Sequence, residues 1–431
     1  MDRRRFFKAA VGSGLGAVIG SPRRNWEHGR FVVDRSQGQF LSSRYAERLT
    51  ELPMQGTTVV DAPKPLAEDH AGCVPDVRVP RVRGQRVRPR PEPSFDQLQW
   101  NIDVLDVDRA HRVTEGAGVR VAVIDSGVYE DHPRLDHALD VDSSRNLTDD
   151  GRDHNPIGDA AHGTAVAGVI AASPAPLASL SGVAPEVDLL DYRVFSKGAA
   201  RLSTILRALE CAAAAGVDVV NLSVNRVPST STAEPGVAGV LGDAVRAVER
   251  NGGIVVAPIG NGGRNLSVDA AAGLPLASVP EVVTVGSVAP ESGDGECAGG
   301  NRSLMPAEYT NYGAPAVDVA APGGETGSAR RNGILTTSID FEFEFEVDES
   351  PNNDLDAQSP AYEWWEGSSF AAPHVAGTAA LLASVDPDRP HRATKRVLRS
   401  YATGAPDPPH KYYGYGVIDA YLPIKNKHES S

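Results

Sequence analysis

Short apolar runs alternate with segments of helical period along most of the chain, from about Gln99 onward. The runs are rich in valine and isoleucine and are bounded by glycine or proline, which is typical of strands buried on both faces. They lie at 118–127, 187–195, 217–224, 253–261, 281–288 and 317–323. Helical patterns lie between and after them, at 162–173, 202–216, 237–252, 367–385 and 392–403. This alternation predicts an α/β domain of three layers, in which helices cover both faces of a mainly parallel central sheet.

Four polar residues stand at strand ends or helix starts in this pattern. Asp125 and Asn261 each follow an apolar run, whereas His162 and Ser369 each open a helical segment. Taken singly, they have ordinary structural explanations as a helix cap, a turn residue, a surface histidine and a small residue at a helix start. In open parallel sheets, however, the functional site lies beyond the carboxyl ends of the strands. Together the four residues supply a carboxylate, an amide, an imidazole and a hydroxyl, which are the parts of an activated serine nucleophile.

The segments that carry these residues resemble the signature blocks of the subtilisin-like serine proteases. VAVIDSGV, HGTAVAG, APIGNGG and GSSFAAPHVAG occur in that family's order of aspartate, histidine and serine. The resemblance extends from about Gln99 to Tyr421. It implies the subtilisin-like fold, a peptidase domain at 93–422 followed by a C-terminal tail at 423–431, and a serine endopeptidase of the peptidase S8 class.

By position, the resemblance assigns a role to each of the four residues. Ser369 would attack the peptide carbonyl, His162 would transfer the proton, and Asp125 would orient and stabilise the imidazolium. The Asn261 side chain and the backbone N–H of Ser369 would bind the oxyanion. Ser368 stands where the family usually has threonine and would assist the oxyanion site.

The same resemblance places a peptide-binding cleft beside these residues. The segment NLSVN would pair with an extended substrate and would contribute Ser223, Val224 and Asn225, while Gly260 would belong to the opposite wall. Gly273 would form the pocket floor. Because the family commonly has glycine at Asn225, the pocket rim is expected to be bulkier or more polar. The implied partners are extended peptides, unfolded proteins and the chain's own propeptide, and we expect a monomer.

No cofactor is expected, and the family's usual calcium site is predicted to be absent. Arg134 stands where that site has a carboxylate, and the loop at 173–182 lacks the usual asparagines. Calcium needs several oxygen ligands, which these changes remove. The acidic loop at 149–155 offers other carboxylates, but a solvated turn is its simpler interpretation.

The N-terminal quarter differs in composition from the rest. Residues 1–22 place arginines before a short run rich in glycine and alanine, which resembles a twin-arginine export signal and predicts a secreted protein. A basic amphipathic N-terminus is the alternative. Residues 23–92 end in alternating arginine and proline and are most simply a solvated linker. The resemblance implies instead a propeptide removed by self-cleavage, although the usual βαβ pattern is not evident.

Charge and apolar content exclude several other classes of function. The net charge of the chain is −14, which argues against nucleic acid as a partner. Residues 1–90 carry 17 Lys/Arg against 9 Asp/Glu, so the remainder carries 25 against 47, a balance typical of surfaces suited to high salt. No apolar run reaches the roughly 18–20 residues that span a bilayer, so no membrane contact is expected after export. Three cysteines are too few for a disulfide framework.

An insertion at about 339–366 precedes the serine block. Its alternating phenylalanine and glutamate predict a half-exposed strand of a hairpin at the cleft rim. The hairpin is either a surface decoration or a substrate gate that uses Trp364 and Trp365.

Three functions stay open: a secreted endopeptidase, a processing protease of narrow specificity, and a peptide-binding pseudoprotease, against which the filled catalytic positions argue.

Overall fold

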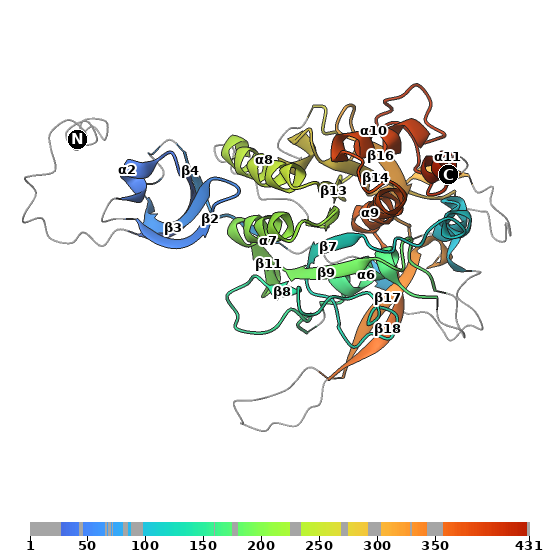
Figure 1. Ribbon diagram of the computed structural model, residues 1–431, viewed down its shortest axis with the longest axis horizontal. Coiled ribbons are helices and arrows are strands. Elements are labelled where there is room, and N and C mark those ends of the chain that lie inside the picture. The colour runs from blue at the N-terminus through green and yellow to red at the C-terminus, as the bar shows by residue number, and fades with distance from the viewer. Residues whose placement is uncertain are drawn as a thin grey trace, which may run out of the picture.

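We describe the protein from a computed structural model. The structure describes residues 27–42, 46–64, 67, 70, 72–80, 85–87, 98–158, 160–174, 180–224, 234–268, 275–291, 303–327, 330–342 and 357–428. The expected signal at 1–22 lies outside the described residues. Figure 1 shows a small N-terminal sheet at one end of a larger α/β body, beside helices α7 and α8 of that body.

An eight-stranded sheet forms the centre of the body. Its strand order is β15-β14-β13-β12-β7-β9-β8, and β16 pairs with β14. All of these pairs are parallel except β14 with β15. The prediction of a mainly parallel sheet is thus confirmed. The strands are β7 (Arg120–Asp125), β8 (Arg145–Asn146), β9 (Asp188–Arg193), β12 (Val219–Leu222), β13 (Ile254–Pro258), β14 (Val283–Pro290), β15 (Leu304–Pro306) and β16 (Val319–Pro322).

Helices cover both faces of this sheet. In β7, Val121 and Val123 join the core formed with α6 and α9, whereas Ala122 and Ile124 join the core formed with α7 and α8. Because successive side chains of a strand point to opposite faces, these two cores are the two interfaces of a three-layer domain, as the sequence predicts. The helices are α4 (Trp100–Val104), α5 (Val107–His111), α6 (His162–Ala171), α7 (Leu202–Ala215), α8 (Glu234–Arg250), α9 (Ser368–Val385), α10 (His391–Tyr401) and α11 (Leu422–His428).

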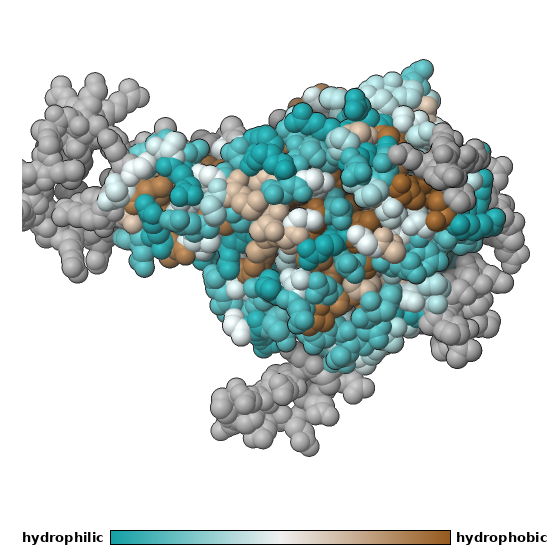
Figure 2. All heavy atoms as spheres, viewed as in Figure 1, coloured by the Kyte–Doolittle hydropathy of each residue, from teal (hydrophilic) through white to brown (hydrophobic). Residues whose placement is uncertain are grey.

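Two further features concern the surface and the end of the chain. Hydrophilic residues make up most of the face shown in Figure 2, with smaller hydrophobic areas between them. Among the described residues, no helix is both long and apolar enough to cross a membrane. The predicted tail is helical in its described part, up to His428, where α11 packs against α9 and α10 and buries Ile424.

The predicted hairpin is present as β17 (Ile334–Glu342) and β18 (Ala357–Glu366), which pair antiparallel. Residues 343–356 lie outside the described residues. The hairpin is not a surface decoration along its whole length, because β17 packs against α6 and is buried from Ile334 to Ile339. A gate made of Trp364 and Trp365 is wrong, since the two side chains are only 2% and 3% exposed and belong to the core.

The N-terminal segment is folded, so the solvated-linker prediction is wrong for its described residues. Strands β1 (His28–Asp34), β2 (Glu47–Leu52), β3 (Thr57–Pro63) and β4 (Cys73–Pro75) form an antiparallel sheet in the order β2-β3-β1-β4, with the short helix α2 (Gly38–Leu41). One face packs Phe31 and Val33 around α2, and the other packs Val32 and Val59 into the core shared with α7 and α8. This two-sided burial is what stabilises so short a segment.

The contact between α6 and the hairpin makes the first prediction. A Cβ added to Gly168 of α6 would lie 2.0 Å from Oγ1 of Thr337, so Gly168→Ala should overpack the interface and lower the free energy of unfolding by about 1–3 kcal/mol. Gly239→Ala in α8 is the matched control, because no atom of the residues described here would lie within 4 Å of the added Cβ. The control should raise stability by about 0.5–1 kcal/mol in chemical denaturation. Equal stability of the two variants would contradict the packing.

Candidate active site

The carboxylate and the imidazole meet where β7 ends and α6 begins. Asp125 is the last residue of β7 and is fully buried. His162 is the first residue of α6, and its Nδ1 lies 2.9 and 3.0 Å from the two carboxylate oxygens of Asp125. Because Nδ1 is engaged by the carboxylate, Nε2 is the nitrogen left to exchange a proton with another group.

A serine that the sequence did not single out joins these two elements. The Ser126 hydroxyl donates to the carbonyl of Ala160 at 2.9 Å and accepts the N–H of Gly163 at 3.0 Å. A Cβ on Gly163 would lie 2.4 Å from the carbonyl oxygen of Gly127, so the close approach requires glycine. In the sequence Ser126 has the signature of an ordinary turn residue, which is why its bridging position was missed.

Ser369 lies in the first turn of α9, the helix against which the imidazole of His162 packs. Its Oγ is buried and has no hydrogen-bond partner among the described residues. The His162 ring packs against Phe370, with the ring centroids 5.3 Å apart, and edge-on against Trp365 at 6.2 Å. These contacts bring the imidazole to the helix that carries the serine. In enzymes without bound substrate, catalytic hydrogen bonds are often long or poorly aligned, and they tighten only when the substrate binds.

The turn that leads into α9 is held from outside the helix. Gly367 has φ of 143°, a conformation that strongly favours glycine, and its N–H donates to the Tyr309 hydroxyl at 3.0 Å. Burial raises the pKa of Tyr309, so this hydroxyl stays neutral. Tyr309 in turn donates to the carbonyl of Gly324 at 2.7 Å. No local pattern around Tyr309 could have indicated this contact.

A proline in α9 redirects the carbonyl of the serine. Pro373 has no N–H, so the carbonyl of Ser369 lacks its usual helical donor. The Ser223 hydroxyl, just beyond β12, donates to that carbonyl at 3.3 Å and accepts from Asn221 Nδ2 at 2.8 Å. Ser223 therefore supports the nucleophile-bearing turn through its side chain.

Asn261 follows β13, and its amide is oriented by Ser368. Its Oδ1 accepts the backbone N–H of Ser368 at 2.9 Å and the Ser368 hydroxyl at 2.6 Å. Since both donors bind the amide oxygen, the Asn261 Nδ2 is left to donate to another group. It lies close to Gly367, because a Cβ added to that glycine would be 3.1 Å from Nδ2. Gly260 completes the contact by donating its N–H to Ser368 Oγ at 3.1 Å. Ser368 thus orients the amide that is expected to bind an oxyanion.

The predicted substrate-binding residues are only partly described. Ser223 and Val224 are buried beyond the end of β12, whereas Asn225 and Gly273 lie outside the described residues. The structure adds an edge that the sequence did not indicate, β11 (Ala199–Arg201). It pairs antiparallel with β10 (Phe195–Ser196) on one side and with the chain's own β5 (Arg78–Pro80) on the other. An edge that pairs with one extended segment can pair with another.

The acidic loop at 149–155 is exposed at residues 149 and 151–153, as a solvated turn would be, but Asp150 and His154 are anchored to the body of the protein. The buried Arg193 guanidinium binds both carboxylate oxygens of Asp150, at 2.8 and 2.9 Å. Burial alone would raise the pKa of Asp150, but the hydrogen bonds from Arg193 hold it well below its ordinary value. Arg134 is also buried, donating to the carbonyl of Ser173 at 3.0 Å and to the Tyr362 hydroxyl at 3.2 Å.

No metal or cofactor site emerges from the described part of the chain. Within it, no group of three or more histidine, cysteine, aspartate or glutamate side chains could hold a metal ion. The predicted absence of the usual calcium site stays a prediction.

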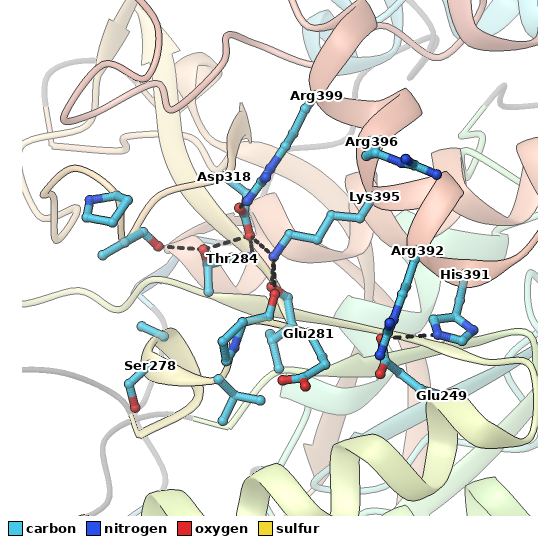
Figure 3. A pocket seen from close by; sticks show the side chains of 16 residues that line it. Glu249, Ser278, Glu281, Thr284, Asp318, His391, Arg392, Lys395, Arg396 and Arg399 are labelled. Atoms are coloured by element: carbon cyan, nitrogen blue, oxygen red, sulfur yellow. Dashed lines mark hydrogen bonds and ion pairs between the residues drawn. The ribbon is translucent and has the colours of Figure 1, made fainter.

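A pocket of about 610 Å³ lies apart from these residues, between α10 and the 3-10 helix η3 (Pro275–Ser278). In Figure 3 Lys395 and Arg399 point toward Asp318, and His391 points toward Glu249. Lys395 lies 2.9 Å from Asp318, and His391 lies 3.2 Å from Glu249. This pocket contains none of the candidate catalytic residues.

His374 in α9 is buried and structural. Its Nδ1 lies 2.7 Å from the carbonyl of Phe370 and its Nε2 lies 2.9 Å from Asn101 Nδ2. With Nδ1 donating and Nε2 accepting, the ring is neutral, in keeping with the burial that lowers the pKa of His374 to about 4 from 6.5.

This environment predicts acid sensitivity. Below pH 6.5 the unfolded chain protonates His374 while the folded chain does not, so the free energy of unfolding should fall between about pH 6.5 and 4, by up to roughly 3 kcal/mol. His374→Gln should make the pH dependence of unfolding shallower over that window in denaturation experiments. An unchanged slope would contradict a neutral His374.

Comparisons with known proteins agree with the geometry. Residues 116–416 match the model of the subtilase family. The chain is 30% identical over 362 residues to mycosin-4 of Mycobacterium tuberculosis, covering 77% of this chain and 70% of that protein. It is 32% identical over 292 residues to the thermophilic serine proteinase of Bacillus sp. (strain AK1), covering 67% of this chain but only 58% of that relative's length.

Solved structures with the same fold include two proteases that process leader peptides or lanthipeptides by name. The epidermin leader peptide processing serine protease of Staphylococcus aureus aligns with a TM-score of 0.70 over 93% of this chain and 98% of that one. At 22% identity it shows the fold alone. A lanthipeptide protease aligns with a TM-score of 0.60 at 25% identity, over 77% of this chain and 94% of that one.

Proposed function

The chain belongs to the subtilase family, and from this premise we propose that it is a serine endopeptidase that hydrolyses peptide bonds through an acyl-enzyme. The observation that carries the proposal is the hydrogen-bonded pair of Asp125 and His162 packed against the helix that bears Ser369. The expected substrates are extended peptides or unfolded proteins, because an edge strand recognises backbone rather than sequence.

In the proposed reaction each residue acts through the atom that the structure leaves available. Ser369 Oγ attacks the peptide carbonyl while His162 Nε2 takes its proton, and the buried Asp125 carboxylate stabilises the imidazolium through Nδ1–H. The oxyanion accepts hydrogen bonds from Asn261 Nδ2 and from the Ser369 N–H, which lies in the first helical turn where no intrahelical acceptor exists. His162 then protonates the leaving amine, and water hydrolyses the acyl-enzyme.

Loss of the amide donor should slow turnover without weakening binding. Asn261→Ala should lower kcat by about 100- to 1,000-fold with little change in KM, because the interaction forms with the oxyanion. Asn251→Ala, at the exposed end of α8, is the matched control and should keep full activity.

Ser369→Ala should abolish labelling by a fluorophosphonate probe. If the unaltered protein escaped labelling, a peptide-binding pseudoprotease would be the better assignment.

The N-terminal segment is proposed to be a propeptide that occupies the substrate cleft. Asp76 accepts both the N–H and the hydroxyl of Ser203 at 2.8 Å each, in the first turn of α7, which otherwise has no side-chain cap from its own N-cap residue. A carboxylate at a helix N-terminus is favourable, so this contact fastens the segment to the body. Beyond it, β5 lies along β11, and β6 (Gln85–Val87) pairs with β18 next to the serine block.

This placement supports self-processing as part of the proposal. Gln85 pairs with Glu366, three positions before Ser369, while Pro80 pairs with Ala199 of β11. We expect cleavage at a bond between Pro80 and Gln85, detected by intact mass and N-terminal sequencing. The Ser369→Ala variant should keep its leader and should be cut when active protein is added. Cleavage of purified Ser369→Ala at the same bond without added enzyme would instead implicate another protease.

Two finer aspects remain part of the proposal. Export through a twin-arginine signal at 1–22 is supported by the sequence alone. A narrow-specificity processing role is the second candidate, because a lanthipeptide protease shares the fold at 25% identity over most of its length. A peptide-library cleavage profile separates the two: a single dominant motif supports processing, and broad cleavage supports a general endopeptidase.

A further inference from the structure

A second buried histidine–aspartate pair lies beside Asp125 and His162. Asp191 of β9 is fully buried, and its Oδ2 lies 3.2 Å from Nδ1 of His154. Strand β9 pairs with β7 so that Asp191 lies opposite Val123, two residues before Asp125. The mechanism above makes no use of either residue, although a buried carboxylate next to a catalytic one is costly.

This second pair contacts the turn that follows Asp125, through one hydrogen bond and one close packing contact. The N–H of Val128 donates to Asp191 Oδ2 at 2.8 Å. A Cβ on Gly127 would lie 2.6 Å from the carbonyl oxygen of His154, so the loop that carries His154 closes directly over the turn. Between these two contacts and Asp125 lies Ser126, whose hydroxyl fixes the start of α6 and with it His162.

The charges around His154 come from three directions. Glu130 Oε2 lies 3.2 Å from its Nε2, Asp191 lies at its Nδ1, and Asp153 is near in its own loop. Burial works to lower the pKa of His154, but these carboxylates raise it overall. The nearby Arg193 is engaged by Asp150 and does not compensate Asp191.

Asp191 depends on His154 for its charge balance. Burial raises the pKa of Asp191 to about 6, with the charge of Asp125 adding to the effect and His154 opposing it. The other carboxylate oxygen, Oδ1, is buried and has no hydrogen-bond partner within the described part of the chain. A protonated His154 is thus the counter-ion that keeps Asp191 from adding an unbalanced negative charge beside Asp125 and His162.

We infer that His154 and Asp191 are positioning residues for the proposed peptidase reaction: they fix the turn after Asp125 and, as a charge-balanced pair, set the field in which His162 takes up its proton. The inference rests on the proposed function. It makes a prediction that a purely structural role does not. Replacing Asp191 removes a negative charge beside His162, whereas replacing His154 removes a positive one, so the two variants should have opposite effects.

The test measures the acidic limb of the pH profile of kcat/KM, which reports the free enzyme's base. Asp191→Asn removes a negative charge, disfavours the His162 imidazolium and should move the limb to lower pH by about 0.5–1 unit. His154→Gln keeps a hydrogen-bond donor for Asp191 but removes its counter-ion, which raises the pKa of Asp191 further. Asp191 is then partly protonated near the limb, so the limb should move upward by a smaller amount. The double variant should return close to the original profile.

A milder variant and a second readout guard against loss of folding and loss of activity. Glu130→Gln, at a partly exposed side chain, should fold and move the limb downward by a smaller amount. NMR titration of His162 in the Ser369→Ala background should show the same shifts without any turnover. Shifts of both single variants in one direction, or an unmoved His162 titration, would overturn the inference. An inactive parent protein with the expected NMR shifts would instead overturn the proposed function alone.

Discussion

The buried hydrogen bond between Asp125 and His162 is the constraint on which the rest of the site depends. It joins the end of a central strand to the start of a helix on one face of the sheet, so the sheet and α6 must meet within a narrow tolerance. Ser126 and the glycine at 163 secure that meeting, and the hairpin β17–β18 presses α6 from outside. A buried carboxylate without partners is strongly unfavourable, so the imidazole and the N–H of Ser126 also stabilise the fold around Asp125.

The serine is placed by a second set of contacts that converge on the start of α9. Tyr309 accepts the N–H of the preceding glycine, and Ser368 orients Asn261. The Ser223 hydroxyl donates to the Ser369 carbonyl, which has no helical donor because residue 373 is proline. The segments that follow two strands, β12 and β13, and the loop that carries Tyr309 therefore determine where one hydroxyl lies. Such a distributed support is the usual way in which rigid elements hold a reactive group in place.

The N-terminal segment shows how a folded arrangement can escape sequence analysis. Its strands are short and its end is rich in arginine and proline, so no period stood out, yet Val32 and Val59 complete a core with α7 and α8. The acidic loop departs from expectation at one point for the same reason: Arg193, 43 residues away, binds Asp150 in a largely buried ion pair, although residues 149 and 151–153 are exposed. In both cases the partner lies far away in the chain.

By itself, the sequence determined the layered α/β fold and the identity of Asp125, His162, Asn261 and Ser369 as the candidate residues. Strand–helix alternation and short motifs are local patterns, and local patterns survive in one sequence. Only the tertiary structure decided the supporting contacts of Ser126, Tyr309 and Asp191, the burial of Trp364 and Trp365, and the docking of the N-terminal sheet. Those features depend on which surfaces meet after folding, and no spacing along the chain encodes them.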